Sequence, residues 1–385
     1  MRTGRRVLIQ TAAFALAAAM AAAALLLPPG GGALAVAAFF HNPLAAGAVW
    51  DGAQKQKEKT QAARADWAQK QGAQNTPAPT QAPTASPGPS PSATPAPSPS
   101  ATPAPTAPPD IQNPQPIVAQ QYRQGSGDGY VALEAGSVKN STDYPDAELG
   151  AAIHGADGAL PFEIELNSEE PQVLILHTHA TETYQTWEEP WYDPNFTARV
   201  QDKALNMCAV GARMAEILNA AGINTLHDET LHDSPSYTES YARSAQTGRD
   251  YLEKYPSIKV ILDVHRDAIE NSDGARVKPL CQIEGEDTAQ VMIIAGCSNG
   301  DTIRLPNWRL NLQFAAAWES RMEALYPGLT RPVLCGYRFY NQDLTTGSLL
   351  IEIGGHANTV TEAIRGGEYA AKALAALFSG QKDAG

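Results

Sequence analysis

Short apolar runs alternate with segments of helical periodicity throughout residues 171–385. The run VLIL at 173–176 has the length of a buried strand, and residues 203–221 carry apolar side chains at helical spacing up to Gly222, a residue type that commonly follows a helix. Further strands are expected at 223–226, 260–263, 291–295 and 349–353, and further helices at 237–255, 310–325 and 359–378. This alternation predicts an α/β fold with a mainly parallel, twisted sheet and helices on both faces.

The first 116 residues have a different composition. Residues 1–6 form a basic tail, and the apolar run at 7–27 is long enough to cross about 30 Å of hydrocarbon, which predicts one transmembrane anchor and an extracytoplasmic domain. A cleaved signal peptide is the alternative, and it exports the same domain. The expected order is then a polar stalk at 28–75, a disordered Pro-rich spacer at 76–116, an entry segment at 117–170 and the catalytic domain at 171–385.

Charge and cysteine usage limit the classes of function. The formal net charge is −13, and no cluster of Lys and Arg follows the N-terminus, so a nucleic-acid partner is not expected. The four cysteines, Cys208, Cys281, Cys297 and Cys335, lack CxxC spacing, which argues against a structural zinc site. An exported location permits disulfides, with Cys281 and Cys297 as the pair to test, and free buried thiols are the other interpretation.

Polar side chains follow or interrupt three of the expected strands, where ligands of open α/β sheets bind. They are His177, His179 and Glu182 after the first strand, His265 and Arg266 after the strand at 260–263, and Glu352 inside the run at 349–353. Individually, each histidine could simply cap a strand, and Glu352 could pair with Arg266. Together they supply the His and carboxylate ligands, with an open position for water, that a catalytic zinc ion requires.

A second His and acid cluster, HDETLHD at 227–233, follows the expected strand at 223–226. It could support the zinc ligands or orient substrate, but short polar clusters between periodic segments are usually loops, so a solvated loop is preferred. Residues 337–341 and 366–367 could shape a groove and are assigned no chemistry.

At these residues the sequence resembles the stage II sporulation protein P family of cell-wall hydrolases. The matching stretches are VLILHTHATETY at 173–184, the segment 222–241, VILDVHRDA at 260–268 and LTTGSLLIEIGGHAN at 344–358. The resemblance implies an N-acetylmuramoyl-L-alanine amidase fold, a zinc ion, cleavage of stem peptides from glycan and a second endopeptidase activity on peptide cross-links. It also implies work during engulfment, in the septal space between mother cell and forespore, beside stage II sporulation proteins D and M.

The resemblance further implies roles for single residues. Zinc is expected at His179, Glu182 and His265, with His177 as the alternative to His179 and Asp202 as the alternative to Glu182. Glu352 is expected to take a proton from water and return it to the departing L-alanine nitrogen. Arg266 or His177 is expected to steady the tetrahedral oxyanion.

Two other classes of protein compete with this hypothesis. One is a catalytically inactive module that binds peptidoglycan or acts as a scaffold, because one fold can host many functions. The full set of metal ligands and base argues against it. The other is an exported zinc peptidase of a different kind, but the sequence contains no HExxH helix.

Overall fold

The computed structural model describes residues 111, 113–154 and 160–380. The expected cytoplasmic tail, transmembrane anchor, stalk and nearly all of the spacer lie outside the described residues. Within the described ranges, no helix combines the length and the apolar character needed to cross a membrane.

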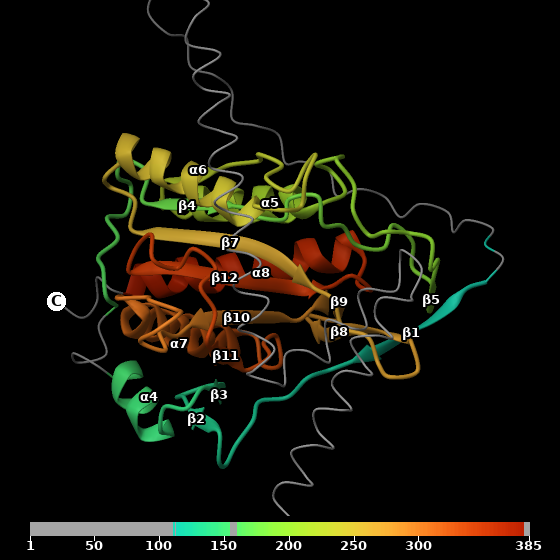
Figure 1. The fold of residues 1–385 in the computed structure, drawn as a ribbon, viewed down its shortest axis with the longest axis horizontal. Helices are drawn as coiled ribbons and strands as arrows, with labels where there is room; N and C mark the ends of the chain where they lie inside the picture. The colour runs from blue at the N-terminus through green and yellow to red at the C-terminus, as the bar shows by residue number, and fades with distance from the viewer. Residues whose placement is uncertain (1–110, 112, 155–159, 381–385) are drawn as a thin grey trace, which may run out of the picture. The chain divides into compact units, whose positions relative to one another are not determined.

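An eight-stranded sheet forms the centre of the fold, with the strand order β2-β3-β11-β10-β12-β7-β4-β6 (Figure 1). The strands are β2 Tyr130–Ala132, β3 Ser137–Ser141, β4 Val173–Leu176, β6 Thr225–His227, β7 Val260–Asp267, β10 Val291–Gly296, β11 Val333–Gly336 and β12 Gly347–Gly355. The neighbours β12, β7, β4 and β6 are parallel to one another, as are β10, β11 and β3. Because β10 is antiparallel to β12, the mainly parallel sheet contains two parallel blocks that run in opposite directions, and the edge strand β2 is antiparallel to β3.

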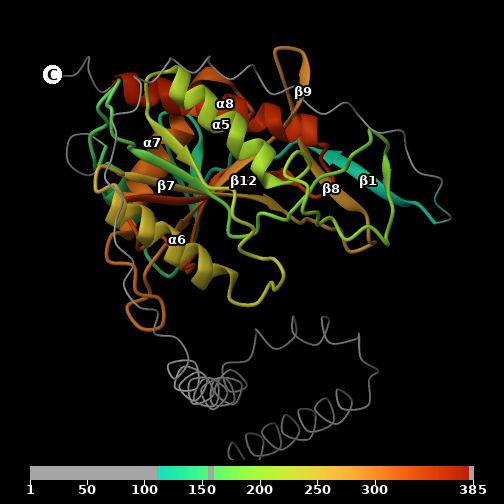
Figure 2. The same ribbon diagram turned by 90° about the horizontal axis from the view of Figure 1, so that it is seen from above.

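Helices cover both faces of this sheet, as the sequence predicts, but unequally. The helices are α4 Asp146–Ile153, α5 Met207–Ala220, α6 Ser240–Lys254, α7 Trp308–Leu325 and α8 Val360–Gly380. Figure 2 shows α5, α7 and α8 on one side of the sheet and α6 on the other. The main core, with Phe314, Trp318 and Phe378, lies on the three-helix side, and a smaller cluster around Leu174 and Ile261 packs against α6.

Local side-chain contacts set the helix ends. The Asn206 side chain accepts a hydrogen bond from Cys208 N at 2.9 Å, so α5 begins at Met207 and later than its apolar pattern predicts. Gly222 follows the end of α5 with a φ of +78°, in the left-handed region that glycine adopts without strain. At α8, Thr359 and Glu362 form a reciprocal capping box through hydrogen bonds of 3.0 and 3.2 Å.

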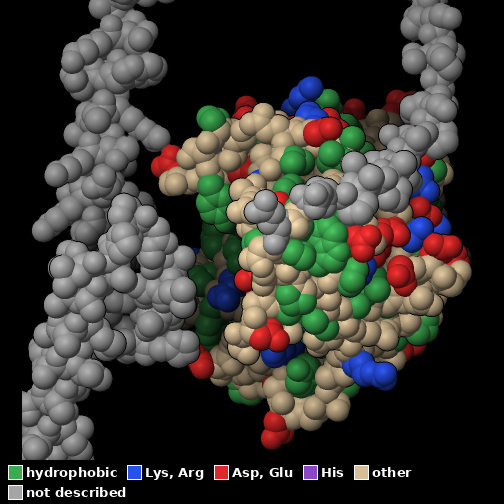
Figure 3. Space-filling model, turned by 90° about the vertical axis from the view of Figure 1, so that its right-hand side faces the viewer, with side chains coloured by type: hydrophobic (Ala, Val, Ile, Leu, Met, Phe, Trp, Pro, Cys, Tyr) green, Lys and Arg blue, Asp and Glu red, His purple; other side chains and the backbone are tan. Residues whose placement is uncertain are grey.

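The folded unit begins before Pro171. Residues in the expected entry segment contribute β2 and β3 to the large sheet, α4 to the surface of α7, and most of β1 to a second sheet. This second sheet has the order β5-β1-β8-β9 and consists of β5 Trp191–Tyr192, β1 Gln115–Gln120, β8 Arg276–Ile283 and β9 Glu286–Ala289. Figure 3 shows the side of the molecule where β1 and β8 lie, and Lys and Arg side chains stand there in separate small groups on the visible surface.

The structure does not bring Cys281 to Cys297. The Cys281 thiol contacts Thr288 O at 3.5 Å, whereas Cys297 Sγ lies 2.8 Å from Cys335 Sγ. The second pair is close because Cys297 directly follows β10 and Cys335 lies in the adjacent strand β11. All four cysteines are buried free thiols in this structure.

Gly211 in α5 provides a test of the packing between this helix and the sheet. A Cβ at this position would lie 2.5 Å from His177 Nε2 and 2.6 Å from His227 Nε2. We therefore expect Gly211→Ala to lower the free energy of unfolding by about 1–3 kcal/mol, measured by urea denaturation.

Gly150 in α4 is the matched control, because the only contact of an added Cβ would be Val131 Cγ1 at 3.8 Å. Gly150→Ala should raise the free energy of unfolding by about 0.5–1 kcal/mol, since alanine is the better helix former. Equal effects of the two substitutions would contradict the packing argument.

Candidate functional site

The carboxyl ends of three neighbouring strands bring the main site residues together. The register of β12 on β7 places Glu352 opposite His265, and the register of β4 on β7 places Leu176 opposite Asp263. His179 and Glu182 lie in the segment that directly follows β4. The sequence prediction that these polar residues converge at one edge of the sheet agrees with this arrangement.

His265 lies between two carboxylates. Its Nδ1 atom is 3.7 Å from Glu182 Oε2, and its Nε2 atom is 2.8 Å from Asp263 Oδ1, although that contact is not aligned as a hydrogen bond. Burial favours the neutral ring, but the negative charge of Asp263, followed by that of Glu182, outweighs burial and raises the pKa of His265 to about 9. In the absence of a metal ion, His265 is therefore a cation at neutral pH.

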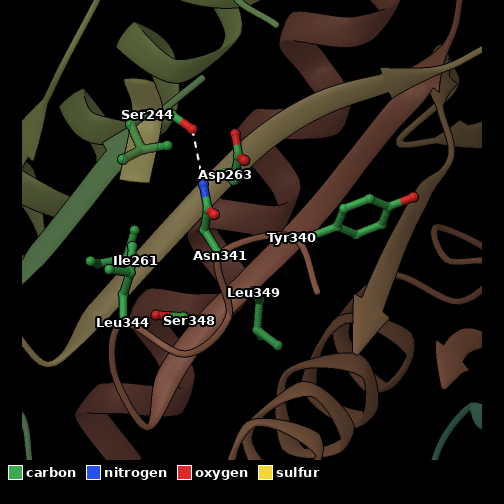
Figure 4. A pocket seen from close by; sticks show the side chains of 9 residues that line it. Ser244, Ile261, Asp263, Tyr340, Asn341, Leu344, Ser348 and Leu349 are labelled. Carbon is green, nitrogen blue, oxygen red and sulfur yellow. Dashed lines mark hydrogen bonds between the residues drawn. The ribbon is translucent and has the colours of Figure 1, made fainter. Parts of the chain in front are cut away.

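Asp263 is held in place by hydroxyl and amide donors. Thr178 donates to it from its backbone N at 2.8 Å and from Oγ1 at 2.6 Å. Behind this pair, Ser244 Oγ is 2.6 Å from Thr178 Oγ1 and accepts a hydrogen bond from Asn341 Nδ2 at 3.0 Å. Figure 4 shows Ser244, Asn341 and Asp263 around a small pocket on the α6 side of the sheet. Burial opposes ionisation of Asp263, but His265 and the Thr178 donors dominate and lower its pKa.

Glu352 is the least supported carboxylate of the group. Its Oε2 atom is shielded from solvent and has no hydrogen-bond partner among the described residues. Burial raises the pKa of Glu352 to about 8; the nearby charges of Asp267 and Glu182 add to this effect, while His265 opposes it. A carboxyl group with a pKa near neutrality can both accept and donate a proton at working pH.

His179 faces the cluster from the loop after β4. Its ring lies edge-on to His265, with the centroids 5.2 Å apart, and stacks on the exposed ring of Tyr237 at 4.4 Å. Burial, together with the charge of His265, lowers the pKa of His179 to about 4. His179 is therefore neutral at physiological pH, which is the form that binds metal ions.

Glu182 and His179, rather than Asp202 and His177, lie beside His265. Asp202 is exposed and accepts a hydrogen bond from Ala204 N at 3.0 Å. Both ring nitrogens of His177 are engaged, Nδ1 with Val264 O at 2.8 Å and Nε2 with His227 Nε2 at 2.9 Å. Burial lowers the pKa of His177 to about 3, so this ring is a neutral interior group with neither nitrogen facing the cluster.

Residues 228–233 form a loop, as the sequence predicts, but the expectation that this loop is solvated throughout is wrong. His232 and Asp233 are buried, and His232 Nδ1 lies 2.8 Å from His177 O. Asp233 Oδ2 accepts hydrogen bonds from Thr181 Oγ1 at 2.6 Å and from Arg199 Nη1 at 2.7 Å. Because Arg199 Nη2 also reaches Glu182 Oε1 at 3.3 Å, the loop supports the candidate site. The sequence HDETLHD has one apolar residue, so its composition gave no signal of this burial.

Arg266 points away from His265, as successive residues of a strand must. Its guanidinium donates to three backbone carbonyls, Thr183 O at 2.8 Å, Ala198 O at 2.9 Å and, more weakly, Asp267 O at 3.4 Å. These bonds use three of its five N–H donors, and the side chain also lines an open cleft together with Glu182. Arg266 therefore holds the segment after β4 in place and borders the cleft, and it does not pair with Glu352.

The donor set partly fits a zinc ion. Two ligands of a tetrahedral zinc ion lie about 3.4 Å apart, close to the separation of His265 Nδ1 and Glu182 Oε2, and Asp263 faces the other ring nitrogen as carboxylates do behind zinc-bound histidines. His179 supplies a neutral imidazole next to them. In the arrangement of the described residues, however, no three His, Cys, Asp or Glu side chains are already grouped to hold a metal ion.

The protein is thus an α/β protein with a mainly parallel sheet and a buried His and Glu cluster beyond the carboxyl ends of its parallel strands. The model of the stage II sporulation protein P family matches residues 53–375, and the chain belongs to this family. Stage II sporulation protein P of Bacillus subtilis (strain 168) is 30% identical over 218 residues, which cover 54% of this chain and 50% of that protein. The chain thus matches about half the length of this curated relative.

Three solved structures are similar at low identity. The CwlD amidase of Clostridioides difficile, in complex with the GerS lipoprotein, is 12% identical, with 55% of this chain and 97% of that chain covered and a TM-score of 0.33. The N-acetylmuramoyl-L-alanine amidase of Clostridium difficile 630 is 14% identical, with 57% and 100% covered and a TM-score of 0.33. The N-acetylmuramoyl-L-alanine amidase AmiC2 of Nostoc punctiforme is 13% identical, with 55% of this chain and 97% of that chain covered and a TM-score of 0.32. Likenesses at this level carry no information about activity.

The raised pKa values predict how the stability of the metal-free protein depends on pH. Folding opposes ionisation of Glu352. The resulting loss of stability is absent below pH 4.5, the ordinary pKa of the side chain, and is complete above about pH 8. Folding favours protonated His265, so this stabilisation is complete below 6.5 and is lost as pH rises through about 9. Both effects make stability fall as pH rises.

We expect Glu352→Gln to remove the contribution of Glu352 to this decline, because glutamine does not ionise. The decline should therefore disappear between about pH 4.5 and 6.5 and become shallower between 6.5 and 8, where the contribution of His265 remains. The measurement is the urea midpoint of both proteins across this pH range in the presence of a chelator. A variant whose midpoint falls as steeply as that of the wild type would show that Glu352 is not held protonated.

Proposed function

We propose that this protein is a zinc-dependent peptidoglycan hydrolase of sporulation. It cleaves the amide bond between N-acetylmuramic acid and L-alanine of the stem peptide, and it also cleaves peptide cross-links. The observation that carries the proposal is the convergence of His265, Glu182 and the unpartnered carboxylate of Glu352 beyond the carboxyl ends of β4, β7 and β12. Membership of the stage II sporulation protein P family supports the cellular setting.

In the proposed mechanism, His179, Glu182 and His265 would hold a zinc ion, which when bound would supply Lewis-acid activation of water and of the scissile carbonyl. The carboxylate of Asp263, 2.8 Å from Nε2, would favour by its charge the ring orientation in which Nδ1 lies 3.7 Å from Glu182 Oε2. Glu352 takes the proton from the attacking water and passes it to the departing L-alanine nitrogen, a role that suits a carboxyl group whose pKa is raised to about 8. Arg266 lines the cleft together with Glu182 and keeps two N–H donors that its bonds to carbonyls do not use, so it is the proposed support for an oxyanion formed in the cleft.

The cellular placement is part of the same proposal. An anchor at residues 7–27 would hold the catalytic domain in the septal space between mother cell and forespore, with the Pro-rich spacer setting its reach toward the wall. Stage II sporulation proteins D and M are the proposed partners, and peptidoglycan is the substrate.

The first experiment compares the peptides that wild-type protein and Glu352→Gln release from purified peptidoglycan, measured by mass spectrometry. Removing the proton-transfer group should lower kcat by about 10²- to 10⁴-fold. Glu253→Gln, which removes an exposed carboxylate on α6, is the control and should retain full activity. Full turnover by Glu352→Gln would refute the assigned role.

The same assay separates the enzyme from a binding module. A zinc hydrolase should release free stem peptides, and a chelator should abolish this release. Peptidoglycan that binds to the wild-type protein but yields no fragments, with zinc added and with the proposed partners present, would favour the inactive binding module instead.

A second experiment tests the metal site without using catalysis. Asp263→Asn should lower the affinity for zinc by about 10- to 100-fold, because an amide supports the His265 ring less well than a carboxylate. The measurement is competition for zinc against a chromogenic chelator, with the exposed Asp250→Asn as the matched control. Equal zinc affinity in the two variants would exclude the proposed support by Asp263.

A further inference from the structure

An open cleft lies beside the His and Glu cluster and extends to residues that the proposed mechanism does not use. Glu182, Arg199 and Arg266 border it, and so do Glu270, Arg276 and His356. The acids among these lining residues are Glu182 and Glu270, and the bases are the three arginines. The cleft is therefore richer in cations than a protein with a net charge of −13 would suggest.

Arg276 is oriented in this cleft but not fully hydrogen-bonded. It is the first residue of β8, and its guanidinium carbon lies 3.8 Å from the centroid of the Tyr192 ring, in cation–π contact. Its Nε donates to Glu270 Oε1 at 3.3 Å. Its Nη1 is buried and has no hydrogen-bond partner in the part of the chain that the structure describes. A buried charged donor without an acceptor is costly, which indicates that a ligand completes it.

His356 presents a second unpartnered polar atom. The bulge between Glu352 and Gly355 in β12 turns the chain so that His356 N donates to Asp267 O at 2.9 Å, and the side chain is buried. Its Nε2 lacks a hydrogen-bond partner within the described ranges. Burial, together with the charges of Arg266 and Arg276, lowers the pKa of His356 to about 3, so the ring is neutral and offers a single N–H.

The carboxylate of Glu270 lies between Arg276 and His356. One oxygen, Oε1, lies 3.3 Å from Arg276 Nε and 3.9 Å from His356 Nε2, which is too far for a hydrogen bond to the histidine. The Glu270 side chain is 52% exposed, so it can rotate into solvent and leave its position to an incoming group. Arg266 adds to the attraction, because its guanidinium is bonded to carbonyls and not to a carboxylate.

We propose that Arg276 and His356 form a subsite for a free carboxylate on the peptide portion of the substrate, with Glu270 as the internal group that this carboxylate displaces. The subsite rests on the proposed function for the identity of its ligand, since the stem peptides of peptidoglycan carry free carboxylates. It would select acidic peptides over amidated ones and set the position of the peptide relative to Glu352.

The test measures binding, not turnover. The probes are the stem tripeptide L-alanyl-γ-D-glutamyl-diaminopimelate and the same peptide with its carboxylates amidated, titrated into the full-length protein by calorimetry. The wild type should bind the acidic peptide more tightly than the amidated one. Arg276→Gln should weaken binding of the acidic peptide by about tenfold, the loss expected for one charge-assisted hydrogen bond, and should leave the amidated peptide unaffected.

Glu270→Gln provides a change of opposite sign that misfolding cannot mimic. Removal of the competing carboxylate should tighten binding of the acidic peptide several-fold and should not affect the amidated peptide. Arg249→Gln, which removes an exposed cation outside the cleft, is the control for net charge and should leave both affinities unchanged.

Equal binding of the two peptides by the wild type would overturn the subsite, and so would an Arg276→Gln effect that is the same for both peptides. These outcomes are distinguishable from a failure of the proposed hydrolase. Discrimination between the peptides without any cleavage of peptidoglycan would support the subsite and refute the enzyme, whereas cleavage without discrimination would refute the subsite alone.

Discussion

The parallel registration of β12, β7 and β4 is the constraint on which the candidate site depends. Parallel neighbours end at the same edge of a sheet, so the register that pairs Glu352 with His265 also fixes where the loop after β4 begins. A shift of one residue in β7 would place Arg266 opposite Glu352 in place of His265, and it would turn the His265 side chain to the other face of the sheet. Such a shift would be costly. Strand β7 lies beside β4, which is apolar and buried along its whole length, and a shift would turn the apolar side chains of β7 away from the faces of the sheet where they are covered.

The carboxylates at this edge of the sheet differ in the number of hydrogen bonds that they accept from neighbouring side chains, and this difference matches their proposed roles. Asp263 and Asp233 each accept hydrogen bonds from a threonine, and these contacts hold the two side chains in place. Glu352 lacks such support, so burial determines its pKa. Tyr340 and Asn341 both have positive φ values, which are unfavourable for residues other than glycine. This backbone brings the Asn341 side chain to Ser244, which in turn contacts Thr178, the hydrogen-bond donor to Asp263.

The sequence predicts the central strands because they are buried on both faces and therefore read as continuous apolar runs, as in β4 and β10. It does not reveal β8, where buried and partly exposed residues alternate, or β3, which is short and polar. The choice between His177 and His179 could not be made from spacing, since both follow the end of β4. It depends on Val264 O and His227, which occupy the two nitrogens of His177. The burial of His232 and Asp233 likewise arises from contacts with segments distant in the sequence.

The segment before Pro171 determines more of the site than its composition suggests. Strand β1 is parallel to β8 and pairs Ile117 with Arg276, so it fixes the start of the strand that carries the cationic end of the cleft. Strand β5, which holds the Tyr192 ring under Arg276, is itself paired with β1. A chain that began at Pro171 would therefore lose the strand that joins β5 to β8, together with β2 and β3 of the large sheet. The candidate site and the proposed subsite consequently depend on different parts of the sequence. The first lies beyond the apolar runs β4, β7 and β12, whereas the second depends on β1, β5 and β8.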